Sequence, residues 1–459
     1  MATKTFSRRD LLRTTLAGAA GLAGMAVLGG CGGAPQANQP AQGSQPTAGA
    51  GAAPSQEPVT IRFHARIGAQ EDALYDLQMP KFMEAHPNIK LTKESFPGAE
   101  FAAKVSTMQA GGTLGDVVWS ALGQAKIQFA YAQKTVNPID DVVKAQNVDL
   151  KQWYEGCLKG ITVDGKLLGL PFKAHPGLAV IYYNTTAFEA AGLPVPTADW
   201  TQADQIAAAK SLTKAAGDKV DQFGYLPNTT WKGFVTLMRA LGSELISEDG
   251  KTFQLNNDKG VQAVQYLYDF FHTHKVAPTP AQVTGLGPDA NAAWTSGKLA
   301  MYQGGTSVSN LQNTIGDKFK WMAVGNPKGP SGVGGSDYEV DAMCLTTASQ
   351  HPNEAFQWMQ YLCGQDSGVL LGVIGGTVGG RPDVYNSPVL LRNEYRKVFK
   401  DLMDNAQDSR ITANWRQEEA EKALDQLTQP LWAGEAKPDK AFIDNVAAQI
   451  QDIMNKPRP

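Results

Sequence analysis

The amino-acid sequence predicts an α/β protein with more than one domain. Short apolar segments of strand length alternate with longer segments whose apolar residues recur at helical spacing. The first three strands alternate with helices in the order β-α-β-α-β, which favours a parallel sheet with helices on both faces. The chain has 459 residues. The roughly 400 residues after its N-terminal stretch exceed what one hydrophobic core usually supports, so two domains are expected.

Residues 1–31 have the pattern of an export signal. Arg8 and Arg9 precede a weakly apolar run at 16–28, which ends in Leu28-Gly29-Gly30-Cys31. The run is short and rich in Gly and Ala, whereas a spanning helix needs about 20 strongly apolar residues. The arginine pair resembles a twin-arginine signal, and residues 28–31 resemble the lipobox of bacterial lipoproteins, in which the cysteine is acylated. We expect a signal peptide over 1–31 and a lipid on Cys31. An ordinary N-terminal anchor with an incidental cysteine is the alternative, and export by the general secretory route stays open.

Residues 32–57 are predicted to be a flexible linker. From Gly32 to Gln56 the chain has no charged and no aromatic residue, so it cannot bury enough apolar surface to offset the entropy of ordering. A lipid on Cys31 and this linker would tether a folded body to the extracytoplasmic face of a bacterial cell membrane.

The charge of the chain argues against nucleic-acid binding. Cleavage before Cys31 removes four basic residues and one acidic residue from totals of 41 and 44. The mature net charge is then about −6, whereas a nucleic-acid binder would present a basic face.

The elements of the first domain follow the alternation in order. Strands are expected at 59–63, 89–93 and 117–119, and helices at 73–84, 101–109 and 126–133. Pro80 should kink or break the first helix. Asp164-Gly165, between 162–163 and 166–170, predicts a hairpin because a type I′ turn needs positive φ at both central residues.

The remaining elements continue the same pattern. Strands are expected at 178–183, 299–302, 321–324 and 340–345, and helices at 186–191, 232–241, 261–274, 291–295, 353–362 and 418–454. Thr201 could cap a further helix, with Asp204 at its third position in a variant of the capping box. The last helix should be broken near Pro430 and Gly434.

Seven short motifs follow one another along this chain. They are AHPNIKL at 85–91, QAGGTLGDVV at 109–118, DGKLLGLP at 164–171, IYYN at 181–184, FEAAGL at 188–193, WTSGKLAM at 294–301 and NEA at 353–355. In this order and spacing the set resembles family 1 of the extracellular solute-binding proteins, the maltodextrin-binding-like lipoproteins of carbohydrate ATP-binding-cassette importers. The resemblance runs from about residue 59 to the C-terminus. One departure is Gly115, where the family usually has proline.

The resemblance implies the two-lobe periplasmic-binding-protein fold of type II, with hinged lobes and a ligand cleft between them. The N-terminal lobe would take 58–174 and 338–374, and the C-terminal lobe 175–337 and 375–459. Closure of the lobes around the solute would be the signal that the permease subunits of the transporter read. A monomer without cofactor or bound metal is expected.

A sugar presents apolar ring faces and hydroxyl edges, so its site needs aromatic rings to stack on and polar side chains for hydrogen bonds. Trp119 ends a strand where the carboxyl ends of parallel strands open into a crevice. Trp231 follows a loop at 227–230, and Trp415 precedes the C-terminal helices. The resemblance implies ligand contact at these positions. Each could instead be a core or surface tryptophan.

Polar candidates lie at predicted strand ends and in the crossing segments: His64, Arg66, Asp116, His175, Asp337, Tyr338 and Arg381. Gly304-Gly305-Thr306-Ser307 follows a strand and offers backbone N–H groups. For Arg381, an ion pair that stabilises one lobe is at least as good an interpretation as ligand contact.

An exported enzyme is the alternative class. Asp337, Glu339 and Asp341 could supply the paired carboxylates of a glycosidase, but no separate acid and nucleophile motif is present. The chain also lacks Gly-x-Ser-x-Gly, His-Glu-x-x-His and a Walker-type phosphate loop. His272 and His274 are two apart on a predicted helix and cannot readily share a metal.

Two further questions stay open in the sequence. A glycerol phosphodiester, a polyamine or a metal could replace the sugar, although the supply of tryptophan favours a sugar. After Cys31 only Cys157, Cys344 and Cys363 remain. Cys344 and Cys363 could form a disulfide, but buried free thiols are favoured because cysteine is often a small core residue.

Overall fold

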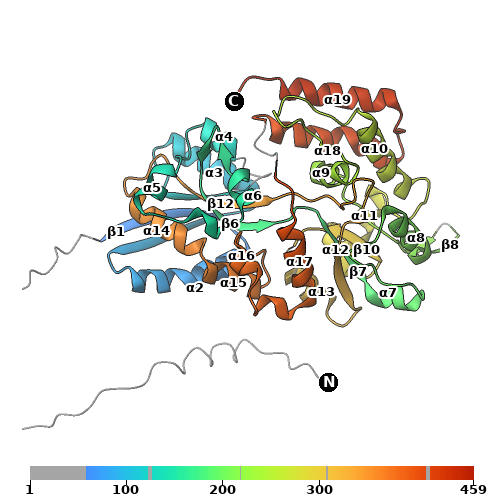
Figure 1. Cartoon of the computed structure of the whole chain (residues 1–459), viewed down its shortest axis with the longest axis horizontal. Helices are drawn as coiled ribbons and strands as arrows, with labels where there is room; N and C mark the ends of the chain where they lie inside the picture. The colour runs from blue at the N-terminus through green and yellow to red at the C-terminus, as the bar shows by residue number, and fades with distance from the viewer. Residues whose placement is uncertain (1–57, 122–126, 218, 307–308, 410–413, 459) are drawn as a thin grey trace, which may run out of the picture. The chain divides into compact units, whose positions relative to one another are not determined.

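The computed structural model describes residues 58–121, 127–217, 219–306, 309–409 and 414–458 (Figure 1). The predicted signal peptide, Cys31 and the predicted linker lie outside these residues. The chain divides into two units, 1–55 and 56–459, and every element below belongs to the second unit. Among the described residues, no helix is both long enough and apolar enough to cross a bilayer.

A five-stranded sheet forms the first layer. Its strands, in spatial order, are β2 (Ile89–Phe96), β1 (Val59–Arg66), β3 (Val117–Ala121), β12 (Glu339–Leu345) and β6 (Leu170–His175). The first three strands of the chain are parallel, which confirms the prediction from their alternation with helices. β12 runs antiparallel to both of its neighbours, so the complete sheet is mixed.

Helices cover both faces of this sheet. On one face Phe63 of β1 lies 5.3 Å, ring to ring, from both Tyr75 of α2 (Ala69–Ala85) and Trp358 of α14 (Pro352–Leu362). On the other face Phe101 of α3 (Gly98–Ala110) lies 5.3 Å from Trp119 of β3. α15 (Gln365–Val373) packs on α2. On β1 the side chains of Ile61, Phe63 and Ala65 are buried, whereas on the other face only His64 is buried and Thr60, Arg62 and Arg66 are exposed or partly exposed.

A second sheet has three antiparallel strands, in the order β10 (Met301–Gly304), β7 (Val180–Asn184) and β11 (Trp321–Gly325). β7 is buried along its whole length. Val180 and Tyr182 belong to one hydrophobic cluster, and Ile181 and Tyr183 to another. The central strand of this sheet thus joins two cores.

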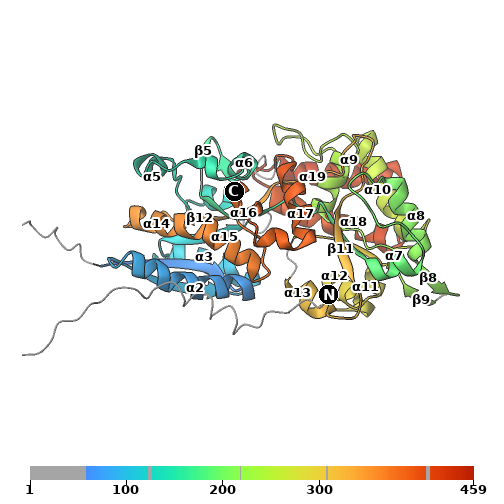
Figure 2. The same cartoon turned by 60° about the horizontal axis from the view of Figure 1, so that its bottom comes forward.

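Besides α14 and α15, the α-helices that follow β7 in the chain are α7 (Thr185–Ala190), α8 (Gln202–Leu212), α9 (Trp231–Ala240), α10 (Asp258–Phe271), α11 (Pro280–Leu286), α12 (Ala290–Thr295), α13 (Ser309–Ile315), α16 (Pro382–Tyr385), α17 (Glu394–Asp404), α18 (Gln417–Ala433) and α19 (Lys440–Met454). α9, α10 and α18 contact one another, and α19 packs on α18. In both views these four helices lie on the side away from α2, α3 and α14 (Figure 1, Figure 2).

The short elements before β6 are α4 (Ile127–Ala132), α5 (Asp140–Ala145), a 3-10 turn (Leu150–Gln152), α6 (Glu155–Gly160) and the hairpin β4 (Thr162–Val163) and β5 (Lys166–Leu167). The hairpin has the predicted turn, with φ of 50° at Asp164 and 71° at Gly165. The capping box of α8 at Thr201 and Asp204 is also confirmed.

Three details of the secondary structure were not predicted. α2 continues through Pro80, and α18 continues through Pro430 and ends at Gly434, whose φ is 83°. Pro80 was expected to kink or break its helix, and the break is absent. The interruption expected near Pro430 and Gly434 is confirmed, because α18 ends at Ala433 and α19 begins at Lys440. A second small hairpin, β8 (Lys214–Ala216) with β9 (Lys219–Gln222), was missed. The strands of the two sheets come from the two sets of segments assigned above to the lobes, and the exact crossover residues stay predictions.

Cys157, Cys344 and Cys363 are buried free thiols. Burial in apolar surroundings raises the pKa of all three thiols. They behave as small core residues, as expected for an isolated cysteine.

Candidate functional site

Trp119 lies in a covered position on β3. Its side chain is 3% exposed, the Arg66 guanidinium stands over its ring at 4.8 Å, and Phe101 packs edge-on against it. It lines a small hollow together with Phe101 and Phe129 of α4. In this arrangement both neighbours hold the indole, and no open ring face is offered to a ligand there.

Trp231 and Trp415 are also covered, each in a different way. Trp231 is the first residue of α9, is 3% exposed and stacks on Phe253 with ring centres 5.5 Å apart. Trp415 is partly buried, and the Arg458 guanidinium lies 3.7 Å from its ring centre. Of the three, only Trp231 lines the charged pocket described below. The structure therefore does not bring the three predicted tryptophans together.

Arg66 belongs to a chain of ion pairs on the first sheet. Its guanidinium lies 3.3 Å from Glu71, and Glu71 lies 2.6 Å from the Lys173 ammonium. Lys173 of β6 lies 2.9 Å from Asp341 of β12. Burial disfavours the charged form of Lys173, but the two carboxylates outweigh it and raise the pKa of the amine. This series of ion pairs connects α2 to β6 and β12 of the sheet.

His64 and Asp116 hold loops and do not line a pocket. The His64 side chain is fully buried, and its Nε2 accepts a hydrogen bond of 2.7 Å from the Gly115 amide. Burial lowers the pKa of His64, so the ring is neutral with its proton on Nδ1. Asp116 accepts hydrogen bonds from the Arg62 amide and the Ser349 hydroxyl. Both are structural contacts at the start of β3.

Tyr338 and Arg381 are likewise anchored within the protein. The Tyr338 hydroxyl donates to the Met403 carbonyl at 3.0 Å. Arg381 makes two hydrogen bonds to Asp383, at 2.9 and 2.6 Å, and stands over Trp153 at 5.3 Å. The ion-pair interpretation of Arg381 fits these contacts. In the segment after β10, the Gly305 carbonyl accepts from Tyr182, and Ser307 lies outside the described residues.

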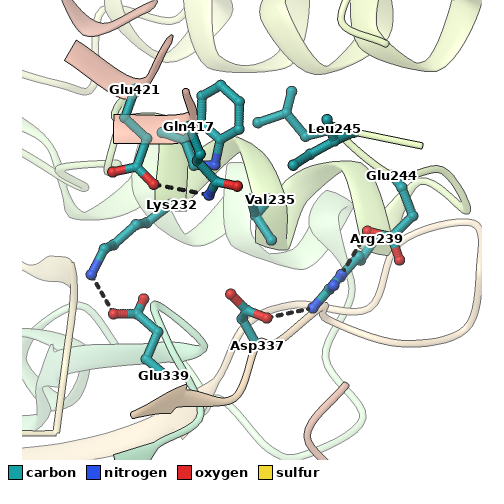
Figure 3. A pocket seen from close by; sticks show the side chains of 11 residues that line it. Lys232, Val235, Arg239, Glu244, Leu245, Asp337, Glu339, Gln417 and Glu421 are labelled. Atoms are coloured by element: carbon teal, nitrogen blue, oxygen red, sulfur yellow. Dashed lines mark hydrogen bonds and ion pairs between the residues drawn. The ribbon is translucent and has the colours of Figure 1, made fainter. Parts of the chain in front are cut away.

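A pocket lined mainly by charged side chains lies where α9, α18 and the start of β12 meet (Figure 3). α9 contributes Lys232, Val235 and Arg239, which are three and four residues apart and so share one helix face. The other lining residues are Trp231, Glu244, Leu245, Ile246, Asp337, Glu339, Gln417 and Glu421. The pocket therefore joins the first sheet, through β12, to helices of the second lobe.

Ion pairs cross this pocket. The Lys232 ammonium binds the Glu339 carboxylate, and His175 Nε2 lies 3.7 Å from the same carboxylate. Arg239 lies 3.1 Å from Asp337 and 3.0 Å from Glu244, and it donates to the Asp408 carbonyl at 2.7 Å. Arg239 is thus fully engaged in holding the crossing segment.

Burial and local charge shift several pKa values here in opposite directions. Burial raises the pKa of Asp337 to about 7, although Arg239 opposes the shift. Burial also raises the pKa of Glu421 to about 7, opposed by a hydrogen bond from Gln417. For Glu339 burial also disfavours the ionised form, but Lys232 and His175 outweigh it and lower the pKa. Burial lowers the pKa of His175. Such opposed shifts are concentrated at functional sites.

The carboxylates considered for a glycosidase are each paired with a different base: Asp337 with Arg239, Glu339 with Lys232 and Asp341 with Lys173. A retaining or inverting pair would need one protonated acid and one free carboxylate flanking the same bond. The described residues also contain no group of three or more His, Cys, Asp or Glu side chains placed to hold a metal ion.

A larger hollow of about 620 Å³ lies beside β11 and α17. Its walls are mostly apolar or backbone, with Met322, Val324, Val333 and Leu402 among them. It shares no residue with the charged pocket.

Sequence reasoning found His175, Trp231, Asp337 and Glu339 of this region but missed Lys232, Arg239, Gln417 and Glu421. Lys232 and Arg239 lie seven residues apart on the polar face of α9, opposite Phe234, Leu237 and Met238, so the sequence alone gives no signal that this face lines a pocket. Gln417 and Glu421 are one turn apart on α18, and only packing against α9 shows that this face is buried.

Comparison with known proteins agrees with the fold. A putative binding protein from Brucella abortus is 24% identical over 85% of this chain and 92% of its own length. The arabinooligosaccharide-binding protein of Bacillus subtilis is 24% identical over 57% of this chain and 60% of its own length. Both likenesses are distant.

Solved structures share the two-lobe fold. The ABC substrate-binding protein Lmo0181 from Listeria monocytogenes, in complex with cycloalternan, superposes with a TM-score of 0.73 at 18% identity and covers 87% of this chain and 100% of its own. The maltose/maltodextrin-binding domain MalE from Bdellovibrio bacteriovorus, bound to maltotriose, has a TM-score of 0.69 at 18% identity, with 87% and 100% covered. The model of the family described as bacterial extracellular solute-binding protein matches residues 68–368. The chain belongs to the bacterial extracellular solute-binding proteins, and it has their type II two-lobe fold.

Proposed function

We propose that this solute-binding protein captures a sugar or oligosaccharide outside the cytoplasm and delivers it to the permease of an ABC importer. The observation that carries the proposal is the charged pocket, since it joins β12 of the first sheet to α9 and α18 of the second lobe. A solute held there contacts both lobes at once. Relatives named for a sugar ligand, such as the arabinooligosaccharide-binding protein of Bacillus subtilis, support the solute class.

Closure of the lobes couples capture to delivery. The ion pair Lys232–Glu339 joins the two lobes across the pocket, and the ion pair Arg239–Asp337 holds the crossing segment beside it. A solute that hydrogen-bonds Glu339 and α18 together favours the closed arrangement over the open one, and differential affinity for the two arrangements is what shifts the population. The closed form is the one that a permease can recognise.

The N-terminal segment supports a membrane-attached protein. The twin-arginine pattern, the lipobox at Cys31 and the linker at 32–57, in which residues 32–56 carry no charge, support a folded body outside the cytoplasm that is tethered by one lipidated residue. The protein acts as a monomer beside its transporter.

The test is a thermal-shift screen of the mature chain against neutral mono- and oligosaccharides, amino sugars, sugar phosphates and polyamines. A ligand at one hundred times its Kd stabilises by about 2.7 kcal/mol, which shifts the melting temperature by several degrees. Glu339→Gln should reduce the shift. Glu189→Gln, which changes an exposed residue of α7, should not. A chain that responds to no saccharide contradicts the proposal.

A further inference from the structure

We propose that the solute carries a protonated amine, and that Glu421 and Gln417 of α18 bind its ammonium group at the top of the charged pocket. The proposal rests on the proposed function, because it concerns the same pocket, and it narrows the solute to an amino sugar. Four features support it: the charges that line the pocket, the unused acceptors beside them, the size of the cavity, and the covered aromatic rings.

The pocket contains more negative than positive groups. Its lining has four carboxylates, those of Glu244, Asp337, Glu339 and Glu421, and two bases, Lys232 and Arg239. Arg239 pairs with Asp337 and Glu244, and Lys232 pairs with Glu339. Among the described residues Glu421 forms no ion pair and accepts one hydrogen bond, from Gln417 Nε2 at 3.0 Å. Of the two carboxylates in excess, one shares Arg239 with another carboxylate, and Glu421 is the one that lacks an ion pair within the described part of the chain.

Gln417 adds an unused acceptor beside this carboxylate. The residue is 3% exposed, and its Oε1 has no hydrogen-bond partner among the described residues. The amide end of Gln417 points toward the interior of the pocket, next to the Glu421 carboxylate (Figure 3). A buried acceptor without a donor costs free energy, so a ligand that donates to it gains by satisfying it.

An ammonium group matches these two acceptors better than a hydroxyl. It has three N–H donors and no acceptor, and it carries the charge that compensates a carboxylate. A sugar hydroxyl brings one donor and leaves the buried charge of Glu421 uncompensated. A second carboxylate, that of Asp425, lies one turn further along α18. It already accepts a hydrogen bond from the backbone N–H of Trp231 at 2.9 Å.

The size and opening of the pocket fit one such group. The cavity is about 20 Å³, enough for about one water-sized group. The Lys232 side chain is 33% exposed, so the pocket opens on that side. The ammonium would enter between α9 and α18, and the sugar ring would lie outside it, beside Lys232 and Glu339.

The aromatic residues favour polar recognition over stacking. Arg66 covers Trp119, Phe253 covers Trp231 and Arg458 covers Trp415. A neutral sugar that relied on these rings would have to displace two guanidinium groups and a phenyl ring. An amine that uses Glu421 and Gln417 displaces nothing.

The experiment is isothermal titration of the mature chain with matched pairs of ligands: 6-amino-6-deoxyglucose against glucose, and a glucosamine trimer against cellotriose. We expect the amine of each pair to bind at least tenfold more tightly. Glu421→Gln should abolish this preference, and Gln417→Met, which keeps the bulk but removes the acceptor, should reduce it. Glu435→Gln removes one charge at an exposed position of the same lobe and should leave the preference unchanged.

The pH dependence provides a second measurement that does not rely on a variant. Glu421 is faced by Lys232 of α9, Glu339 of β12, and Gln417 and Asp425 of its own helix. Its carboxyl must be ionised to bind an ammonium, and burial raises its pKa to about 7. An alkylamine stays protonated to about pH 10. Affinity for 6-amino-6-deoxyglucose should therefore rise about thirtyfold from pH 5.5 to pH 8.

The outcomes separate this inference from the proposed function. Equal affinity for amine and neutral sugar, or a flat pH profile, overturns the ammonium site and leaves sugar binding in place. Binding of spermidine without any saccharide overturns the sugar assignment and keeps the ammonium site. Binding of none of these ligands by a folded chain overturns both.

Discussion

The Glu421 side chain makes stability depend on pH. Its pKa is raised from an ordinary value of 4.5 to about 7 by burial, with Gln417 opposing. The folded protein therefore holds a proton that the unfolded chain releases, and stability falls as the pH rises from about 4.5 to 7. Glu421→Gln should raise the free energy of unfolding at pH 8 by up to about 3 kcal/mol, and with it the melting temperature. At pH 4 both should stay unchanged. Calorimetry of both proteins at the two pH values measures this; an equal shift at both would contradict it.

The three tryptophans should respond differently to truncation. Trp119→Ala removes a buried ring outside the charged pocket, so it should cost about 3–5 kcal/mol of stability without changing affinity per folded molecule. Trp231→Ala should cost as much and also weaken binding, because Trp231 lines the pocket. Trp415→Ala should destabilise least, since the ring is only partly buried. Melting temperature and ligand affinity on the same three variants decide between a core and a contact role.

Residue identity alone predicted part of the site. Trp231, His175, Asp337 and Glu339 could be named because they stand at loop and strand ends, where side chains reach a cleft. Glu421 could not, because a charged residue on a helix is normally solvated. Its burial depends on how α18 packs on α9, and that is tertiary information.

At the scale of elements, local signals were reliable where they were self-contained. The Asp164-Gly165 turn needs only positive φ at two residues, and the capping box of α8 only the Thr201–Asp204 pair. Pro80 does not break α2 because packing outweighs the lost hydrogen bond. Tyr75 and Phe82, on either side of Pro80, are both fully buried and keep the two parts of α2 against the sheet.

The N-terminal segment gives a prediction of its own at this scale. Cys31→Ala should leave the folded body intact but move the protein from the membrane fraction to the soluble fraction, because the lipid on this residue is the only expected anchor. Fractionation and immunoblotting measure the distribution. Cys157→Ala, which changes a buried thiol, is the matched control and should stay with the membrane. A Cys31 variant that remains membrane-bound contradicts the lipobox interpretation.

For the whole molecule, the family assignment rests on the order of many weak motifs rather than on any one. The matched region, 68–368, contains every strand of the two sheets except β1, together with the crossing segments between them. The mixed direction of the first sheet could not be predicted, because β12 arrives from the distant segment after β11 and inserts between β3 and β6. Insertion of a late strand is set by tertiary contacts and leaves no local pattern.

The contact of Arg458 with the first lobe has a kinetic consequence. Beyond α19 the chain is fixed to α18 through Arg416 and Pro457, and the Arg458 guanidinium then reaches Tyr131 at 5.7 Å and Asp164 at 3.4 Å while it covers Trp415. Any opening of the lobes must break these contacts, which together are worth about 1 kcal/mol. Arg458→Ala should therefore release a trapped solute about fivefold faster in stopped-flow experiments, whereas Lys437→Ala, at an exposed position in the turn after α18, should not. The residence time of the solute, and with it the interval available for docking on a transporter, would then be set partly by one arginine that does not line the pocket.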